Sequence, residues 1–176
     1  MYTIIDVETT GGSPKNDRIT EIAIISFNGE RIEESFSTLI NPERNIPPFI
    51  TKLTGISDYM LVNAPKFKEV SEKIFYLTAN KIFVAHNASF DYNFVKEEFN
   101  RIGVKFDRKK ICTVQKSRVL IPGKKSYSLG NICSDMNISI ENRHRALGDA
   151  NATVELFKII MRNHANEFDK KLIFSI

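Results

Sequence analysis

The order of strand-like and helix-like segments constrains the fold of this chain more than any other feature. Three strand-like segments rich in β-branched residues come first, at residues 2–7, 18–28 and 31–40. After a short helix that starts at Pro47-Pro48, helical periods are expected at residues 67–78, 91–102, 114–120, 128–136 and 146–163. Two more strands are expected between these helices, at residues 81–85 and near Ile111. Strands followed by alternating strands and helices predict an α/β domain on a mixed sheet.

With 176 residues, the chain has the length of one globular domain. We expect that domain to cover residues 1–165, with a C-terminal extension over residues 166–176 that matches no motif. No apolar run approaches the roughly 20 residues that span a bilayer, and the N-terminus lacks the features of a signal peptide. Cys112 and Cys133 lack the spacing of zinc or redox sites and are expected to be free thiols. These features predict a cytoplasmic protein with no membrane partner.

The chain is mildly basic, with a net charge of +4 and a pI near 9.0. Seven basic residues and no acidic residue lie between Arg108 and Lys125. Such a segment could line a path for phosphates, because each neutralised phosphate releases a condensed counterion. It could equally be a solvated face that keeps the protein soluble. Charge alone leaves both interpretations open.

The first candidate for chemistry is the acidic pair Asp6-Val7-Glu8. In an extended segment, two residues that are two positions apart point to the same face of the sheet. Two neighbouring carboxylates repel each other, and a hard divalent cation such as Mg²⁺ removes that repulsion. The pair also follows the apolar run Thr3-Ile4-Ile5, where an unpaired charge is costly. A metal site is therefore one interpretation, although D-x-E alone is a weak signal.

Two further motifs lie where a strand or a loop meets a helix: His86-Asn87-Ala88-Ser89-Phe90-Asp91 and His144-Arg145-Ala146-Leu147-Gly148-Asp149. Each has a structural alternative. Asp91 could simply stabilise the dipole of the helix that it begins, with Asn87 or Ser89 as the cap, and Phe90 could be a core residue. His144 could be a structural or surface histidine. His164, near the end of the last helix, is expected to interact with the helix dipole rather than with a site.

Together, D-x-E, H-N-x-x-F-D and H-R-A-L-x-D-A resemble the DEDDh (DnaQ-like) 3′→5′ exonucleases, the family that includes the proofreading subunit of bacterial DNA polymerase III. The resemblance runs from residue 2 to residue 161, and order and spacing agree as well as residue types. Two supporting pieces lie between the motifs, at residues 53–56 and 127–129. Two departures are modest: Cys112 replaces an acidic residue of many relatives, and Thr54 replaces a frequent histidine.

The resemblance implies a ribonuclease H-like fold, with a five-stranded mixed sheet and helices on both faces. It implies two divalent metal ions, Mg²⁺ with Mn²⁺ as a substitute, held by four acids: Asp6, Glu8, Asp91 and Asp149. His144 would be the general base. The residues expected to contact the terminal nucleotide are Thr9, Thr10, Leu53, Thr54 and Phe90.

The resemblance also implies a metal-dependent 3′→5′ exonuclease that releases nucleoside 5′-monophosphates from DNA in proofreading or repair. Its expected partners are nucleic-acid 3′ ends, single-stranded DNA first, together with a polymerase or a fused domain. An RNA-trimming enzyme of the same fold is the nearest alternative, because the catalytic residues do not read the sugar. An inactive nucleic-acid-binding relative is the other alternative. All five catalytic positions are present, which argues against an inactive relative, because such a relative should have lost at least one of them.

Overall fold

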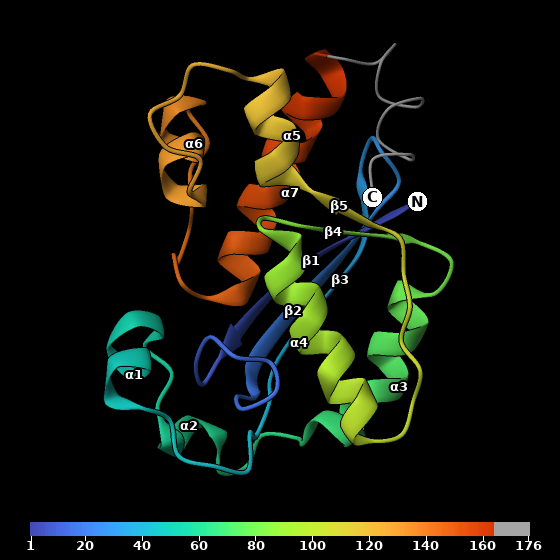
Figure 1. Ribbon diagram of the computed structural model, residues 1–176, viewed down its shortest axis with the longest axis vertical. Helices are drawn as coiled ribbons and strands as arrows, with labels where there is room; N and C mark the ends of the chain where they lie inside the picture. Colours follow the sequence, from blue (N-terminus) through green and yellow to red (C-terminus); the bar gives the residue numbers. More distant parts are fainter. Residues whose placement is uncertain (164–176) are drawn as a thin grey trace.

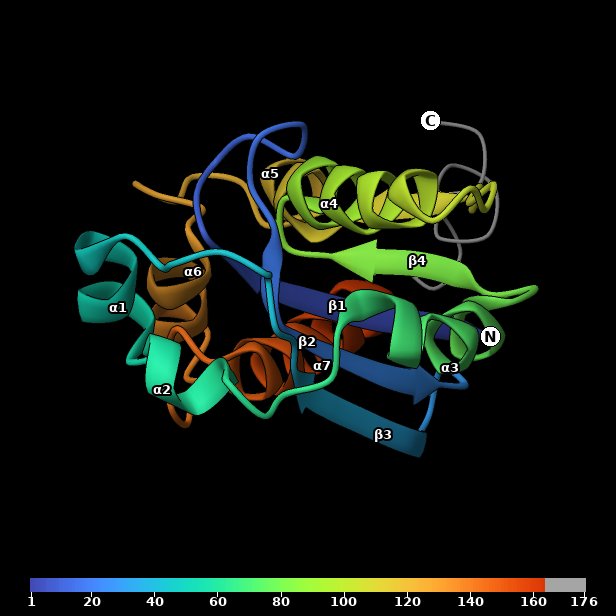
Figure 2. The ribbon, with the colours of Figure 1, turned by 90° about the horizontal axis from the view of Figure 1, so that it is seen from below.

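The computed structural model describes residues 1–163 and confirms the five-stranded mixed sheet. The strands are β1 (Tyr2–Thr9), β2 (Ile19–Phe27), β3 (Ile32–Leu39), β4 (Ile82–Ala85) and β5 (Lys110–Cys112). Their order across the sheet is β3-β2-β1-β4-β5. Figure 2 labels the first four of these strands in that order. β1 pairs antiparallel with β2 and parallel with β4, so the first strand lies at the centre.

Seven helices surround this sheet within the described residues: α1 (Pro48–Thr54), α2 (Asp58–Leu61), α3 (Phe67–Thr78), α4 (Ala88–Arg101), α5 (Thr113–Leu120), α6 (Leu129–Asp135) and α7 (Ala146–Asn163). Figure 1 shows α3 and α4 on one side of the sheet and α5, α6 and α7 on the other. Each side has its own apolar core. Ile5 of β1 packs into the core with Phe67 and Phe99, whereas its neighbour Ile4 packs into the core with Val154 and Phe157. Successive side chains of β1 point to opposite faces of the sheet, so this strand contributes to both cores.

The predicted elements agree with the observed ones, with four differences beyond shifts of one residue at element ends. β1 continues to Thr9, so both acids of D-x-E lie within the strand. α4 begins at Ala88 and not at Asp91, because Asn87 at φ 72° makes the turn out of β4. The Asn87 side chain makes no capping hydrogen bond, so the expected side-chain cap is wrong. α2 was not expected, since a helix of 4 residues leaves no periodic pattern in the sequence.

The basic segment has structural partners along much of its length. The Arg108 guanidinium lies over the rings of Phe75 and Phe106, and Lys110 lies over Tyr92. Lys124 forms an ion pair with an acid of α6. These contacts favour a structural contribution for at least part of the segment.

Both cysteines are free, as expected, although only Cys133 is fully buried. Across residues 1–163, no helix combines the length and the apolar character that crossing a membrane requires. His164 and the predicted extension at 166–176 lie outside the described residues.

Candidate active site

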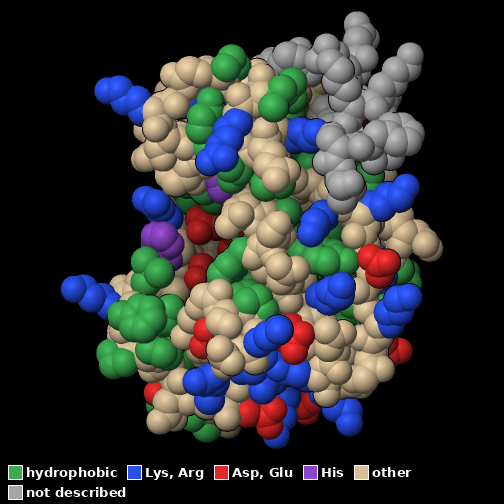
Figure 3. Space-filling view, viewed as in Figure 1, with side chains coloured by type: hydrophobic (Ala, Val, Ile, Leu, Met, Phe, Trp, Pro, Cys, Tyr) green, Lys and Arg blue, Asp and Glu red, His purple; other side chains and the backbone are tan. Residues whose placement is uncertain are grey.

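Three of the predicted acids meet at the C-terminal end of the central strand. Asp6 and Glu8 point to the same side of β1, and Asp149 reaches them from the first turn of α7. One carboxylate oxygen from each of the three residues lies within 4.8 Å of the other two. Figure 3 shows acidic side chains in a hollow beside a group of hydrophobic side chains over α1. Residues 143 positions apart thus form one cluster, which we call the acidic cluster (Asp6, Glu8 and Asp149).

Asp91 lies next to this cluster without being one of its three members. It is buried in the first turn of α4, where its Oδ1 accepts a hydrogen bond of 3.1 Å from the backbone N–H of Val7. Val7 separates Asp6 from Glu8, so this bond ties α4 directly to the D-x-E segment. The charge of Asp91 raises the pKa of Asp6, which shows that the two carboxyl groups are electrostatic neighbours.

Burial raises the pKa of all four predicted acids, and repulsion by neighbouring acids adds to it for Asp6 and Glu8. Burial is the main cause for Asp6, followed by the charge of Asp91 and then of Asp149. Burial and the charge of Asp149 raise the pKa of Glu8 to about 8. Burial raises the pKa of Asp91 to about 7 and also raises that of Asp149. Without a cation, the site would hold protons near neutral pH that ordinary carboxylates have lost.

The chemistry of these side chains fits a hard divalent cation. Carboxylate oxygens are the ligands that Mg²⁺ and Mn²⁺ prefer. The Oδ1 atom of Asp149 is buried and has no hydrogen-bond partner among the described residues. A buried carboxylate oxygen without a donor is costly, and a cation would satisfy it. The acidic cluster can therefore bind a metal ion.

His144 lies beside the cluster, in the segment that joins α6 to α7. Its backbone N–H donates to Asp149 Oδ2 at 3.3 Å. The imidazole charge of His144 lowers the pKa of Asp149, in part offsetting burial. The backbone of His144 is left-handed, with φ 62°, which is uncommon for a residue other than glycine. The fifth predicted catalytic residue is thus attached to the acids by a direct hydrogen bond.

Comparisons with known proteins decide the family. The sequence profile of an exonuclease family (RNase_T) matches residues 3–157, which is most of the chain. The chain belongs to this exonuclease family.

Curated relatives agree with that assignment. The chain is 39% identical over 168 residues to the PolC-type DNA polymerase III of Clostridium perfringens, and 41% identical over 162 residues to the 3′-5′ exonuclease DinG of Bacillus subtilis. These alignments cover 96% and 91% of the chain but only 12% and 17% of the two relatives. The epsilon subunit of DNA polymerase III from Treponema pallidum is 35% identical, over 94% of the chain and 79% of that subunit.

A solved structure confirms the fold. Exonuclease X in complex with 5′ overhanging duplex DNA superposes with a TM-score of 0.79 and 28% identity, covering 98% of this chain and 97% of the other. The predicted ribonuclease H-like architecture of the exonuclease family is therefore confirmed.

Glu21 is a site neighbour that the motifs of the exonuclease family did not indicate, and its partner Arg145 lies within the third motif but was given no role. Glu21 lies on β2 directly opposite Glu8 of β1, and its charge contributes to the raised pKa of Glu8. Arg145 donates to both Glu21 oxygens, from Nη2 at 2.7 Å and from Nε at 3.0 Å. One signal could have identified Glu21, because a lone acid within the apolar run of residues 19–27 needs a buried partner.

His86, the first residue of the middle motif, has a structural role. Its Nε2 lies 2.8 Å from the Tyr127 carbonyl oxygen, to which it must donate, and its Nδ1 lies 2.9 Å from the Thr113 hydroxyl. Burial lowers the pKa of His86, which favours the neutral ring. This histidine therefore connects the end of β4 to α5 and to the loop before α6.

The threonines among the substrate-binding candidates have hydroxyl groups that already form hydrogen bonds. Thr9 donates to the Gly11 carbonyl, Thr10 donates to Asp17, and Thr54 donates to the carbonyl of Ile50. The Thr54 hydroxyl also accepts from the N–H of Ile56. These side chains shape the loops that border the cluster, and leave the backbone and the apolar side chains as the available contacts.

The two apolar candidates differ in exposure. Leu53 is 52% exposed at the end of α1, and Phe90 is half-buried with its ring 4.8 Å from that of Phe94. Phe90 therefore takes part in the core, as its structural alternative proposed, and still has surface left for contact with a ligand.

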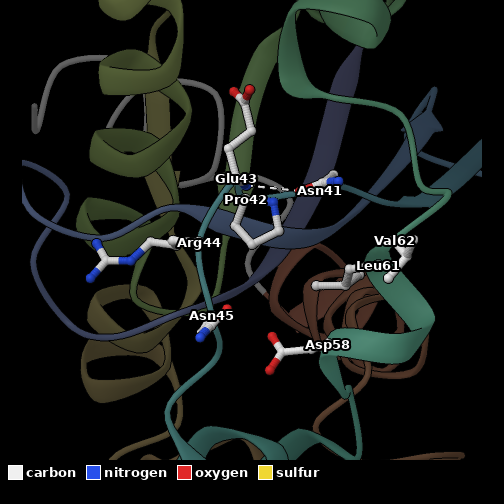
Figure 4. Close-up of a pocket in the computed structure, with 8 residues that line it drawn as sticks. All are labelled: Asn41, Pro42, Glu43, Arg44, Asn45, Asp58, Leu61 and Val62. Atoms are coloured by element: carbon white, nitrogen blue, oxygen red, sulfur yellow. Dashed lines mark hydrogen bonds between the residues drawn. The ribbon is translucent and has the colours of Figure 1, made fainter.

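A second hollow lies away from the candidate residues. It has a volume of about 260 Å³ and lies between α2 and the segment that joins β3 to α1 (Figure 4). Asp58 accepts a hydrogen bond of 2.8 Å from the N–H of Ile46, and Glu43 forms an ion pair with Lys66. Its charged groups therefore hold the loop in place, and none of the predicted site residues lines it.

Proposed function

We propose that this chain is a metal-dependent 3′→5′ exonuclease that hydrolyses terminal phosphodiester bonds of DNA in proofreading or repair. The observation that carries the proposal is the acidic cluster, with three carboxylate oxygens within 4.8 Å in a chain of the exonuclease family. We propose Asp6, Glu8, Asp91 and Asp149 as the metal-binding acids.

Two Mg²⁺ ions, with Mn²⁺ as a substitute, are the cofactors that these acids suit best. Asp6 would be shared between the ions, Glu8 and Asp149 would hold one of them, and Asp91 would act from the α4 side. When bound, the ions would lower the pKa of the attacking water and neutralise charge on the leaving 3′-oxygen. The raised pKa values of Asp6 and Glu8 support this arrangement, because a cation is what such a group of buried acids lacks.

His144 is the proposed general base. A neutral imidazole can accept the proton of the attacking water. The product would be a nucleoside 5′-monophosphate and a strand shortened at its 3′ end. The hydrogen bond between the backbone of His144 and Asp149 supports this role, because it keeps the imidazole close to the acids.

The terminal nucleotide would lie against Leu53 and Phe90, with the backbone around Thr9 and Thr10 holding its sugar and Thr54 shaping the end of α1. Leu53 is one of several exposed apolar side chains in α1, in α2 and directly after α2; the others are Phe49, Tyr59, Met60 and Val62. Exposed aromatic rings next to a phosphodiesterase site suit unpaired bases, which stack on them. These side chains support single-stranded DNA as the substrate.

The comparisons bear on the partners. Solved relatives include Escherichia coli Exonuclease I with a dT13 oligonucleotide, which is only 18% identical, and Exonuclease X with overhanging duplex DNA. Polymerase III proteins among the curated relatives support a polymerase or a fused domain as a further partner. We propose residues 1–165 as the exonuclease domain and residues 166–176 as its extension. The two free cysteines suit a cytoplasmic location.

One assay tests this function. Purified protein is incubated with 5′-labelled single-stranded DNA, duplex DNA or RNA of the same sequence, in Mg²⁺, in Mn²⁺ or in chelator. We expect a ladder of strands shortened from the 3′ end that disappears in chelator, fastest on single-stranded DNA. Asp6→Asn should lower the rate by about 10² or more, because it removes the charge shared between the proposed ions.

Three results would contradict the proposal: products that persist in chelator, an Asp6→Asn protein that works at the wild-type rate, and products that arise only from internal cuts. Faster shortening of RNA than of DNA would instead select the RNA-trimming alternative. Binding without any hydrolysis would select the inactive nucleic-acid-binding module.

A further inference from the structure

Arg145 follows His144 directly and is held by a rigid carboxylate. Its Nη2 and Nε atoms donate to the two oxygens of Glu21, a bidentate geometry that fixes the guanidinium plane as well as its position. The backbone N–H of Ala146 donates to Glu21 Oε2 at 2.9 Å. Two consecutive residues after His144 are therefore attached to a single side chain of the sheet.

Glu21 is a suitable anchor because it cannot move. It is only 4% exposed and lies on β2, which pairs with β1 on one side and with β3 on the other. Its partner in the register with β1 is Glu8, a member of the acidic cluster. The anchor of the His144 segment and the acids of the site are thus built on adjacent strands of one sheet.

The segment is held by few regular contacts apart from Ile138 and Ile140, which pack against the core near its start. Residues 137–145 contain no regular helix or strand, and three of them have positive φ: Asn137, Asn142 and His144. Beside the segment is a cavity of about 270 Å³, lined in part by Glu141, Asn142 and Arg145. Apolar packing therefore does not fix the segment on this side, and its polar contacts must do so.

Gly148 supplies a second contact to the same segment. A Cβ atom built on Gly148 would lie 1.9 Å from the Glu141 carbonyl oxygen and 2.9 Å from that of Asn142. The first turn of α7 and the His144 segment approach so closely that only glycine fits. Any larger residue must displace the segment from α7.

We propose that Glu21 and Arg145 are positioning residues, which hold His144 in place beside the acidic cluster, and that Gly148 permits this placement. The proposal rests on the proposed function, in which His144 is the general base. In this role Glu21 and Arg145 would act through His144 and not directly on the substrate or the metal. A displacement of about 1 Å at a catalytic group is enough to slow a reaction strongly.

A different role is conceivable for the same pair, since Arg145 also lowers the pKa of Glu8. Removing Arg145 could then weaken metal binding instead of misplacing His144. The two roles predict different measurements. A positioning role lowers kcat and needs His144, whereas an electrostatic role lowers metal affinity whether His144 is present or not.

The test is a double-mutant cycle on the full chain with 5′-labelled single-stranded DNA and saturating Mg²⁺. The variants are Arg145→Gln, Glu21→Gln, His144→Ala and the combinations with His144→Ala; Glu21→Gln keeps an acceptor for the Ala146 N–H. We expect Arg145→Gln and Glu21→Gln to lower kcat about 10- to 100-fold, with KM and Mn²⁺ affinity within about twofold of wild type. In the His144→Ala background, neither change should lower kcat further.

An equal loss of kcat with and without His144, or a fall in Mn²⁺ affinity that accounts for the loss, would overturn the proposal. Gly148→Ala, which changes no charge, should give the same signature, and it decides the matter if Arg145→Gln fails to fold. Arg31→Gln is the control variant: it removes the exposed ion pair between Arg31 and Glu33, which are remote in sequence from His144, and should leave kcat unchanged. The proposed function fails separately, if wild-type protein does not hydrolyse DNA or if His144→Ala retains full kcat.

Discussion

Asp91 combines two tasks in one side chain, because its carboxylate both orders the backbone and adds charge to the site. The hydrogen bond from the N–H of Val7 fixes the strand between the two acids of D-x-E. The same carboxyl group is buried and has a pKa raised to about 7, chiefly by burial. The first task needs an acceptor oxygen, whereas the second needs a negative charge. Asparagine at this position would separate the two tasks, because its amide oxygen accepts a hydrogen bond but carries no charge.

Asp91→Asn should therefore fold at least as stably as wild type without metal, since its amide oxygen can still accept from Val7 and a repulsive charge is gone. Its kcat should fall by about 10² or more. Asp91→Ala leaves the Val7 N–H unpaired and should lose about 1–3 kcal/mol of unfolding free energy. Urea unfolding in chelator and an exonuclease assay measure the two effects. Equal stability of the two variants would show that the hydrogen bond contributes nothing.

At the level of single residues, the motifs were sufficient to predict which acidic side chains lie together. Asp6, Glu8 and Asp149 were predicted from motif order, and the structure brings their oxygens together. Glu21 escaped notice, because its role depends on the β1–β2 register and on a partner 124 positions away. Neither the strand register nor the distant partner can be predicted from the spacing of residues within a short segment.

Between elements, one buried carboxylate connects α4 to the loop that follows β1. Glu98 Oε1 lies 2.8 Å from Arg18 Nε and 3.1 Å from Arg101 Nη1, and it also accepts from the N–H of Ile19. Arg101 in turn donates from Nη2 to three carbonyl groups of the loop, those of residues 14, 15 and 17. This loop begins after Thr9 and Thr10, so the network orders the border of the active site.

Glu98→Ala should lower the unfolding free energy by about 3–5 kcal/mol, because it leaves two arginine side chains without their buried counter-charge. Thermal or urea unfolding measures the loss. Glu33→Ala is the matched control: its ion pair with Arg31 is exposed to solvent, and its loss should change the unfolding free energy far less. Similar losses for the two variants would mean that burial does not determine the strength of these pairs.

Elements with strong periodic patterns were the ones that sequence could locate. The helix predicted at 67–78 has the same bounds in the structure, because Phe67, Ile74 and Leu77 fall on one buried face. The start of α4 was placed late, since the left-handed turn at Asn87 depends on how β4 leaves the sheet. The five-stranded mixed sheet was implied only by resemblance, and the order of its strands was not predicted. Pairing between β1 and β4 joins residues about 80 positions apart, a relation that no local pattern contains.

For the molecule as a whole, the acidic side chains of the site repel one another, and the rest of the fold must offset the free energy of that repulsion. The pKa of Asp6 is raised by burial and by the neighbouring acids, that of Glu8 is raised to about 8, and that of Asp91 to about 7. In the unfolded chain these groups titrate near pH 4. Between about pH 4 and pH 8 the folded protein therefore binds more protons than the unfolded chain.

The sign of the pH dependence follows directly. Stability rises with pH only where the unfolded state binds more protons, so here it falls as pH increases through this window. The melting temperature of the protein in chelator should decrease from about pH 6 to about pH 9, by about 2–4 °C for each kcal/mol lost. Mg²⁺ or Mn²⁺ should raise it, and by more at the higher pH, because protons compete with the cation for the same oxygens.

Glu8→Gln isolates the source of this slope, since it removes the group whose pKa is about 8 and leaves the rest of the surface unchanged. Its melting temperature in chelator should vary less between about pH 7 and about pH 9 than that of wild type, and its response to Mn²⁺ should be smaller. Differential scanning calorimetry across the pH range, with and without metal, measures both. If wild type and Glu8→Gln show the same slope and the same response to metal, the repulsion does not reside in the acidic cluster. If the pH dependence of the melting temperature disappears in the variant while folding remains cooperative, the repulsion between these acids is what favours cation binding at the site.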